Sequence, residues 1–378
     1  MTSSGLICVI RVHLWLLIVC LITSTGCGSS SPSSNSSPQP TPSATAEASY
    51  DFTTVDQLLE RMAQRHGGCA LVLIKDGKAI YRKSFGRHTA EKVVPIASAS
   101  KWLSGAVIMS LVDEGKLSLD DTVSKYLPEF DSEKSGITIR QLFSHTSGLP
   151  AEARCRNDKR TTLERCASEI AASRLAASPG EEFFYGGVSM HAGGRIAEVV
   201  SGKPWNDLFV ERIAAPLGMT QTDFHSYGST SNPRPAGDAR SSADDYARFL
   251  QMLLQQGTFN GKQILSAASV REMHKDQTGG ARIEYTIYEN HRDLDPNLLL
   301  ARYGIGMWRE KFDMNSGRLQ ELSSQGYFGF SPWIDVERNL AGVLSVQSRF
   351  GRIMPDYLEL KKEIRRIVPL DSRPLPWK

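Results

Sequence analysis

A serine and a lysine three residues apart are the first candidates for chemistry in this sequence. They stand in the tetrapeptide Ser98-Ala99-Ser100-Lys101, and residues three apart share one face of a helix. A serine hydroxyl becomes a nucleophile when a neighbouring base takes its proton, and a lysine that burial holds neutral can be that base. The same spacing fits a helix-capping serine beside a solvated lysine, so the pair alone leaves both interpretations open.

The surrounding elements place this pair at the start of a buried helix. Residues 98–114 predict a helix that is apolar on most faces, and Gly115 ends it. A β-hairpin is expected over residues 70–86, because two strand-like runs flank Asp76-Gly77. Further strands are expected at 303–309, 317–324, 327–335 and 340–348, and further helices at 137–144, 161–174, 188–201, 205–214, 242–256, 266–274 and 356–367.

Strands at both ends of the chain with helices between them indicate an α+β fold. One antiparallel sheet would be built from both termini, with a mainly helical lobe inserted. The predicted domain runs over residues 52–370. Its sheet lobe comprises 52–118 and 291–370, and its helical lobe comprises 119–290.

Several short motifs, taken in order, resemble the serine β-lactamase and penicillin-binding-protein superfamily, and in particular its class C-like, β-lactamase-related branch. The resemblance runs from about residue 52 to residue 365. The matching segments are 98–101, 114–121, 126–130, 145–150, 184–185, 216–219 and 236–250. It implies a three-layer, β-lactamase/DD-peptidase-like fold with the sheet flanked by helices.

The resemblance also implies catalytic roles. Ser98 would be the acylated nucleophile, Lys101 would hold or accept its proton, and Tyr185 would be a second base. Since a free tyrosine has a pKa near 10, a positive Lys101 beside Tyr185 would have to favour the phenolate. The implied enzyme is a serine acyl hydrolase that needs no cofactor and acts on a small-molecule or peptide-like acyl substrate.

Two positions depart from the family's pattern. The second motif reads Tyr185-Gly186-Gly187, with a glycine where asparagine is usual. The third motif should open with a basic residue and instead reads Ser324-Gln325-Gly326, followed by Tyr327. Gly326 still permits close backbone approach, and the Tyr327 N–H can complete an oxyanion hole. Gly187 and residues 324–327 are therefore the expected substrate-binding and oxyanion residues.

The missing third-motif cation bears on the substrate, because such a cation pairs with a substrate carboxylate. Arg349, just past the last strand, is a candidate replacement. Because the third motif lacks its cation, the sequence favours an esterase-like activity on uncharged esters or amides. The alternatives are a D-alanyl-D-alanine carboxypeptidase or weak β-lactamase, and a binding protein that keeps the fold without hydrolysis.

Two other residues invite a catalytic interpretation. Ser189, in Gly187-Val188-Ser189-Met190-His191, nearly matches the nucleophile elbow of α/β-hydrolases, but that fold needs a parallel sheet. His145 opens the segment 145–150, which is better explained as a structural turn that Gly148 and Pro150 fix.

The N-terminus predicts export. Arg11 and an apolar run from Val12 to Ile22 fit a secretory signal peptide over residues 1–26, and small residues lead into Cys27 as in a bacterial lipoprotein. Residues 27–51 are rich in Ser and Pro and predict a disordered tether. The expected location is the bacterial cell envelope, by a lipid on Cys27, with ordinary secretion as the alternative; the oligomeric state stays open.

Composition and cysteines narrow the remaining classes. With 44 Lys+Arg against 41 Asp+Glu, the chain has no electrostatic reason to bind nucleic acid. In an oxidising compartment Cys155 and Cys166 are disulfide candidates, and Cys69 is expected to be simply buried. No cysteine pair has CxxC spacing and the histidines are scattered, so a metal site is not predicted.

Overall fold

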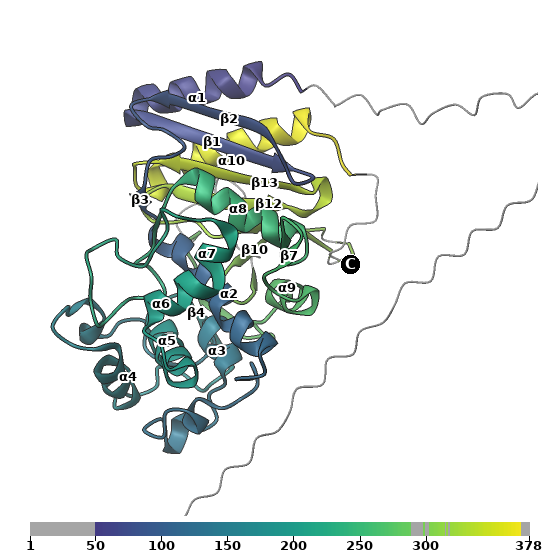
Figure 1. The fold of residues 1–378 in the computed structure, drawn as a ribbon. Coiled ribbons are helices and arrows are strands. Elements are labelled where there is room, and N and C mark those ends of the chain that lie inside the picture. The colour runs from purple at the N-terminus through teal and green to yellow at the C-terminus, as the bar shows by residue number, and fades with distance from the viewer. Residues whose placement is uncertain (1–49, 289–297, 299–301, 314, 317, 372–378) are drawn as a thin grey trace, which may run out of the picture. The chain divides into compact units, whose positions relative to one another are not determined.

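Strands from the two ends of the domain form one seven-stranded antiparallel sheet (Figure 1). The computed structural model describes residues 50–288, 298, 302–313, 315–316 and 318–371. The strand order is β2-β1-β13-β12-β11-β10-β9, so the N-terminal hairpin pairs with the last strand, as predicted. The strands are β1 (Gly68–Lys75), β2 (Lys78–Gly86), β9 (Arg302–Tyr303), β10 (Trp308–Phe312), β11 (Leu319–Ser323), β12 (Phe330–Asp335) and β13 (Leu340–Val346).

The predicted hairpin is confirmed and one predicted strand is wrong. Asp76 and Gly77 have φ angles of 52° and 76°, as a two-residue hairpin turn requires. The strand expected at 303–309 is interrupted between β9 and β10. There Gly304 and Gly306 approach backbone carbonyls of a neighbouring helix and of α2 (Ser100–Asp113) so closely that a Cβ at either position would clash. The Gly304 N–H donates to the Met307 carbonyl at 2.9 Å in the turn that joins β9 to β10, and the two strands pair antiparallel.

Alternate residues of β1 face two different hydrophobic clusters. Cys69, Leu71 and Leu73 pack with α1 (Thr53–His66) and α10 (Phe350–Ile367) on one face of the sheet. The residues between them pack with α2 and α8 (Ala243–Leu254) on the other face, and Figure 1 shows α8 below β13. The fold is therefore α+β in three layers, as predicted. Helix α10 begins earlier than the predicted 356, because it accommodates Pro355 within its N-terminal half.

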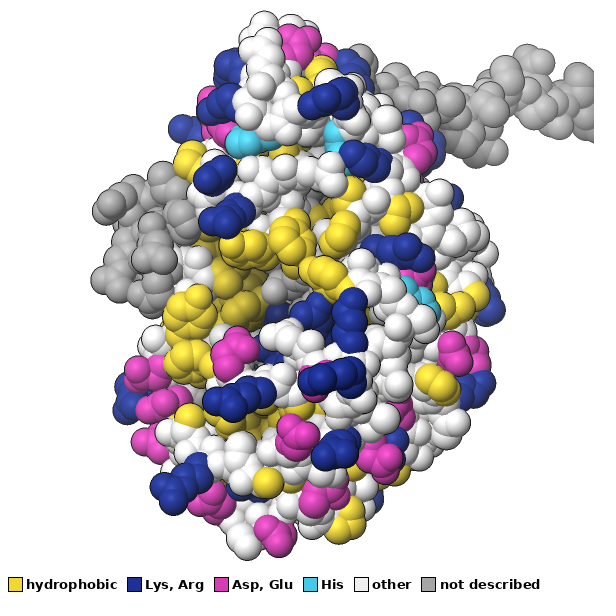
Figure 2. All heavy atoms as spheres, turned by 90° about the vertical axis from the view of Figure 1, so that its left-hand side faces the viewer, with side chains coloured by type: hydrophobic (Ala, Val, Ile, Leu, Met, Phe, Trp, Pro, Cys, Tyr) yellow, Lys and Arg dark blue, Asp and Glu magenta, His cyan; other side chains and the backbone are white. Residues whose placement is uncertain are grey.

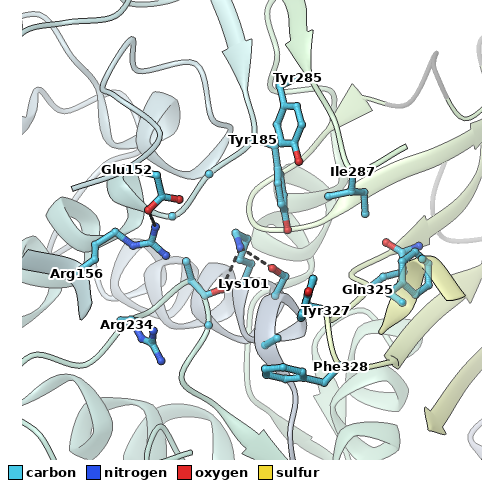
Figure 3. A pocket seen from close by; sticks show the side chains of 18 of the residues that line it. Lys101, Glu152, Arg156, Tyr185, Arg234, Tyr285, Ile287, Gln325, Tyr327 and Phe328 are labelled. Atoms are coloured by element: carbon cyan, nitrogen blue, oxygen red, sulfur yellow. Dashed lines mark hydrogen bonds and ion pairs between the residues drawn. The ribbon is translucent and has the colours of Figure 1, made fainter. Parts of the chain in front are cut away.

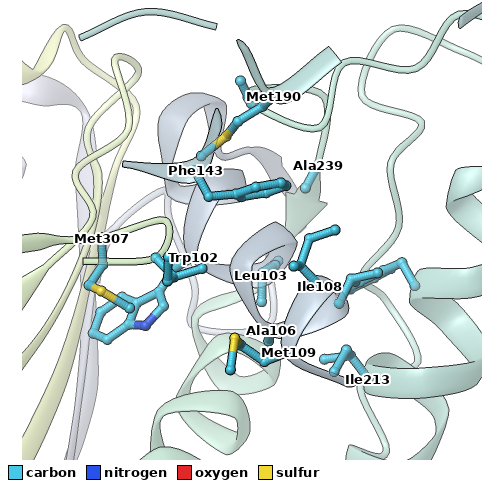
Figure 4. Packing of buried hydrophobic residues seen from close by; sticks show 14 of the residues in the cluster. Trp102, Leu103, Ala106, Ile108, Met109, Phe143, Met190, Ile213, Ala239 and Met307 are labelled. Atoms are coloured by element: carbon cyan, nitrogen blue, oxygen red, sulfur yellow. The ribbon is translucent and has the colours of Figure 1, made fainter. Parts of the chain in front are cut away.

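Helix α2 is surrounded by apolar side chains. Every residue from Ser100 to Leu111 is buried. Figure 4 shows Trp102 beside Met307 on one side of the helix and Ile108 on another. Burial on all sides fixes the helix in position, and its N-terminal end carries the serine and lysine of interest.

The helices between the two parts of the sheet lie where the sequence predicts, with one difference. They are α3 (Ile139–Phe143), α4 (Leu163–Ala171), α5 (Val188–Ser201), α6 (Trp205–Phe209), α7 (Ala215–Leu217) and α9 (Ala267–His274). The helix expected at 205–214 ends at Phe209, and a π-helical turn, Val210–Ala214, follows it. Pro216 has no N–H to donate back into this turn, which fits the change of helix type.

Three pairs of short strands complete the fold. These pairs are β3 (Val94–Pro95) with β5 (Arg240–Ser241), β4 (Glu182–Phe184) with β8 (Arg282–Tyr285), and β6 (Thr258–Phe259) with β7 (Lys262–Gln263). The described residues, from Tyr50 onward, belong to one compact unit. The predicted signal peptide, Cys27 and the tether up to residue 49 lie outside the described residues. Among the helices that the structure does describe, none combines the length and apolar character needed to cross a membrane.

Candidate active site

Ser98 and Lys101 are in direct contact at the start of α2. Ser98 lies in a short 3-10 turn, Ala97–Ala99, that leads into the helix. Lys101 Nζ donates to Ser98 Oγ at 3.0 Å and to the Ala236 carbonyl at 3.0 Å. The lysine is buried and the serine is half-buried at the pocket surface. The solvated lysine that the sequence left open is therefore excluded.

The surroundings of Lys101 favour its neutral form. Burial, and secondarily the positive charge of Arg156, lower the pKa of Lys101 from 10.5 to about 7. Its hydrogen-bond partners are a hydroxyl and a carbonyl, and neither carries the negative charge that would hold the proton on the amine. Near neutral pH, a large fraction of this amine can accept a proton from Ser98.

Tyr185 follows β4 and lies over the same lysine. Lys101 Nζ is 4.7 Å from the centre of the Tyr185 ring, and the ring stacks on Trp308 with centroids 5.0 Å apart. Burial raises the pKa of Tyr185, although its hydrogen bond with Ser98 opposes the shift. Burial thus acts against the phenolate that the sequence expectation required, and Lys101, with a pKa of about 7, carries only part of a charge near neutral pH.

Two backbone N–H groups near Ser98 lack backbone partners. Within the described part of the chain, neither the Ser98 N–H nor the Tyr327 N–H donates to a backbone carbonyl. Gly326 brings the Tyr327 loop close, because a Cβ at this position would clash with the Ile96 carbonyl. Residues 326–329 form a tight turn in which the Gly329 N–H donates to the Gly326 carbonyl at 2.9 Å. This arrangement leaves both N–H groups free for an oxyanion.

The third-motif side chains point in different directions. Ser324 Oγ donates to the Ser98 carbonyl at 3.1 Å, which ties the end of β11 to the nucleophile turn. The Gln325 amide donates to Glu310 at 3.1 Å and accepts from Tyr288 at 3.1 Å, so this side chain is engaged inside the protein. Figure 3 shows it on the far side of Tyr327 from Lys101. Gln325 lines the pocket without offering its amide to a ligand.

A comparison with known families matches residues 54–361 to the family described as Beta-lactamase. The chain belongs to the Beta-lactamase family. This confirms the resemblance to the serine β-lactamase and penicillin-binding-protein superfamily. Among solved structures, a candidate beta-lactamase from Bacteroides dorei is 33% identical, with a TM-score of 0.76, and the match covers 84% of this chain and 99% of that one.

Curated relatives match over shorter segments. Protein flp from Staphylococcus aureus (strain N315) is 30% identical over 187 residues, which are 45% of this chain and 38% of Protein flp. AmpH from Escherichia coli (strain K12), a D-alanyl-D-alanine-carboxypeptidase/endopeptidase, is 31% identical over 174 residues, which are 42% of this chain and 45% of AmpH. In both cases the match spans less than half of the relative's own length.

The glycine that departs from the family's second motif makes room for an arginine. A Cβ at Gly187 would lie 2.5 Å from Arg156 Nη2 and 2.7 Å from its Cζ. The Arg156 guanidinium thus takes the space that a side chain at position 187 would occupy, and it lines the pocket with Ser98 and Lys101. Arg349, the candidate replacement cation, lies over the Tyr327 ring outside the lining of this pocket.

The pocket has a volume of about 510 Å³ and two unlike walls. Figure 3 shows Arg156 and Arg234 to one side of Lys101, and Tyr327 and Phe328 to the other. Figure 2 shows a hollow with hydrophobic side chains along one side and Lys and Arg side chains along the other. The rim aromatics are unusually exposed, with 55% of Tyr327 and 43% of Tyr285 accessible.

Tyr327 was predicted as a site residue, whereas the sequence missed Arg156, Arg234, Tyr285 and Phe328. No local pattern marks them, because they come from separate segments that only the fold brings together. A glycine in place of the motif asparagine was the one available signal, since it indicates that something else occupies that space.

The rival nucleophile does not reach the pocket. Ser189 lies inside α5, is buried, and exchanges a hydrogen bond with Ser147 Oγ at 2.9 Å. The main sheet is antiparallel, so the α/β-hydrolase interpretation is excluded.

His145 and the cysteines have packing roles. His145 has a φ of 61° and packs its ring 4.8 Å from that of Tyr185; burial and then Lys101 hold its pKa well below the usual value. Cys155 and Cys166 are joined by a disulfide, and burial raises the pKa of free Cys69 to about 12. In the ranges that the structure describes, no three His, Cys, Asp or Glu side chains converge as a metal site would need.

Proposed function

We propose that this chain is a serine acyl hydrolase that forms an acyl-enzyme on Ser98. The observation that carries the proposal is the 3.0 Å contact between Lys101 Nζ and Ser98 Oγ, made by a buried lysine that no carboxylate of the described residues pairs with. Such a lysine can remove the hydroxyl proton as the oxygen attacks. Membership of the Beta-lactamase family supports the same chemistry.

The reaction would proceed in two halves. Ser98 Oγ attacks the carbonyl carbon while its proton passes to Lys101, and the N–H groups of Ser98 and Tyr327 bind the oxyanion. When the tetrahedral intermediate collapses, the leaving group takes a proton through Tyr185, which its raised pKa keeps as a phenol and hence as a donor. The proton gained by Lys101 restores that of Tyr185. Water then attacks the acyl-enzyme and loses its proton to Lys101. When this second intermediate collapses, Lys101 returns the proton to Ser98 Oγ and the acid is released.

Activated short-chain esters are the appropriate first substrates. A p-nitrophenyl ester should give a burst of nitrophenolate, and intact-mass spectrometry should find the acyl group on the peptide that contains Ser98. Ser98→Ala should abolish both. Ser189→Ala is the matched control, because it removes a buried serine hydroxyl in α5 and should leave turnover unchanged. Turnover that survives Ser98→Ala would refute the proposal.

D-Alanyl carboxypeptidase or weak β-lactamase activity is the second candidate. Similarity to part of AmpH supports it, and so do the arginines on one wall of the pocket. This candidate requires covalent labelling of Ser98 by a fluorescent penicillin, and absence of label at high penicillin concentration would remove it. A binding protein without hydrolysis is the third, and an acyl adduct on Ser98 would exclude it.

We also propose, from the sequence of residues 1–51, that the protein is exported and held at the cell envelope by a lipid on Cys27. In a bacterial host the full chain should then fractionate with membranes. Cys27→Ala should release it, and membrane association that persists in this variant would contradict the anchor.

A further inference from the structure

We infer that Arg156, supported by Arg234, binds a carboxylate carried by the substrate and makes the enzyme selective for anionic esters. This inference rests on the acyl transfer proposed for Ser98. It reverses the expectation from the sequence, which associated loss of the third-motif cation with uncharged substrates.

The charges that line the pocket are mostly positive. Lys101, Arg156 and Arg234 are cationic residues of the lining, and Glu152 is the single carboxylate among its described residues. At neutral pH Lys101 carries only part of a charge, so the two arginines dominate. The cationic wall thus lies next to the nucleophile, although the third motif contributes nothing to it.

Arg156 has donors available for a ligand. Its Nη1 donates to Glu152 at 3.0 Å, whereas its Nη2 has no hydrogen bond among the described residues and, unlike Nε, is not fully buried. The exposed fraction is 15% for the arginine side chain and 77% for Glu152. A well-buried cation is thus paired with a carboxylate that lies largely in water and can move away. A planar carboxylate from a substrate can take its place, because guanidinium matches that shape with two parallel hydrogen bonds.

Arg234 is fixed beside it. Its Nε donates to Asp238 at 2.5 Å and its Nη1 donates to Asn157 at 2.8 Å, while its guanidinium lies 4.6 Å from the Tyr227 ring centre. Because Asp238 offsets much of its charge, Arg234 contributes positive potential and shape, and Arg156 makes the direct contact.

The segment that carries Arg156 is held rigidly. The preceding residue, Cys155, is bonded to Cys166 of α4, and its carbonyl accepts from Asn232 Nδ2 at 2.8 Å. Gly187 provides the space into which the guanidinium extends. A site that is already built costs little ordering on binding, so a carboxylate should gain affinity from it.

The opposite wall indicates what else the substrate contains. Tyr285, Tyr327 and Phe328 are exposed aromatics around the pocket. They suit an apolar part of the molecule that leaves the carboxylate free to reach Arg156. A half-ester of a short dicarboxylic acid, or an aryl ester with a carboxylate on the aryl group, has this character.

Two matched pairs of probes test the inference. Mono-p-nitrophenyl glutarate is compared with p-nitrophenyl pentanoate, and 4-acetoxybenzoate with its methyl ester. We expect at least one anionic probe to have the higher kcat/KM. Arg156→Gln should lower that value by about tenfold or more beyond its effect on the neutral partner, as loss of a charge-assisted bidentate contact would. Arg156→Lys should restore that value only in part. The change for the neutral partner measures the separate influence of Arg156 on the pKa of Lys101.

Two further variants separate binding from a structural effect. Glu152→Gln should raise kcat/KM for the anionic probe, because it removes the competing carboxylate. Arg160→Gln is the charge-matched control: its side chain is 91% exposed and pairs with Asp158, so neither probe should be affected. Equal effects of Arg156→Gln on both members of a pair, or no preference for either anionic probe in the unaltered enzyme, would overturn the inference.

Binding to an inactive protein keeps this test independent of turnover. In the Ser98→Ala background, calorimetry should show tighter binding of mono-p-nitrophenyl glutarate than of the pentanoate, and Arg156→Gln should remove the difference. If that difference is seen and no ester is turned over by the unaltered protein, the proposed hydrolysis fails and the carboxylate site stands. If both probes bind Ser98→Ala with equal affinity, the inferred carboxylate site is refuted, whether or not the unaltered protein hydrolyses esters.

Discussion

Replacing Lys101 with methionine should abolish acyl transfer and stabilise the fold. The lysine is 3% exposed and, within the described part of the chain, pairs with no carboxylate, so its burial opposes folding. Methionine has a similar length and no charge to bury. Without the amine, Ser98 loses its proton acceptor, and general-base catalysis typically contributes about 10²- to 10⁴-fold.

The size of the stabilisation follows from the pKa of Lys101. Burial lowers this pKa from 10.5 to about 7, so the unfolded chain binds more protons than the folded chain between these pH values. The penalty is complete below the folded pKa, diminishes as pH rises, and is absent above the unfolded pKa. Linkage gives a penalty on the order of 4 kcal/mol at pH 7 and about 2 kcal/mol at pH 9.

Urea unfolding of the oxidised protein at pH 7 and pH 9 measures this. Lys101→Met should be the more stable form at both values, and its advantage should shrink by about 2 kcal/mol at the higher pH. Lys361→Met is the control, because Lys361 is also 3% exposed but bonds to Glu310 at 3.0 Å and to Glu321. Its removal takes the lysine from both buried carboxylates, so that Glu321 keeps only Arg365 as a cation and Glu310 keeps the Gln325 amide, and should destabilise the fold by about 3–5 kcal/mol. A Lys101→Met protein that is less stable than the parent, or an advantage that does not change with pH, would refute the reasoning.

Three further predictions concern catalysis and the disulfide. With a neutral ester, kcat/KM should rise about tenfold between pH 5 and pH 6 and level off above about pH 8. The reason is that the neutral form of Lys101 is the base and its pKa is about 7. A value of kcat/KM that does not change with pH over this range would contradict that role. Tyr185→Phe keeps the ring stacked on Trp308 and removes the hydroxyl. Single-turnover acylation should therefore slow about 10²-fold, with the melting temperature almost unchanged. An unaltered acylation rate would mean that the leaving group obtains its proton from another group. Replacing both Cys155 and Cys166 with serine opens a short loop and should cost about 3 kcal/mol in urea unfolding. This double substitution should also lower kcat/KM for anionic esters more than kcat/KM for neutral esters. An equal loss for both kinds of ester would indicate that the disulfide does not position Arg156.

Local spacing explains most of what the sequence could predict. The Asp76-Gly77 turn, the apolar helix after Ser98 and the proximity of Ser98 to Lys101 depend on residues within a few positions of each other. The contact between Arg156 and Gly187 joins positions 31 apart, and no periodicity relates them. The gap between β9 and β10 likewise depends on how closely the backbone approaches another element, which strand patterns do not encode.

The directions in which the pKa values of Lys101 and Tyr185 shift also depend on the fold. From the sequence, Lys101 was expected to be charged and to help Tyr185 ionise. The structure surrounds both groups with aromatic and apolar side chains, so burial raises the pKa of Tyr185 and lowers that of Lys101. Both shifts disfavour charge, which is consistent with the proposed roles of Lys101 as base and Tyr185 as donor.

The two departures from the family's pattern are linked through Lys101. Glycine at 187 admits the Arg156 guanidinium, and the charge of that arginine already contributes to the lowered pKa of Lys101. A second cation at position 324 would lie against the carbonyl of Ser98, since Ser324 Oγ bonds there. It would lower the pKa of Lys101 further, because two cations would then lie close to a buried amine. Serine at 324 avoids this repulsion and still holds β11 to the nucleophile turn. The pocket therefore has its cation at Arg156 and not at position 324, and a substrate carboxylate would bind at Arg156.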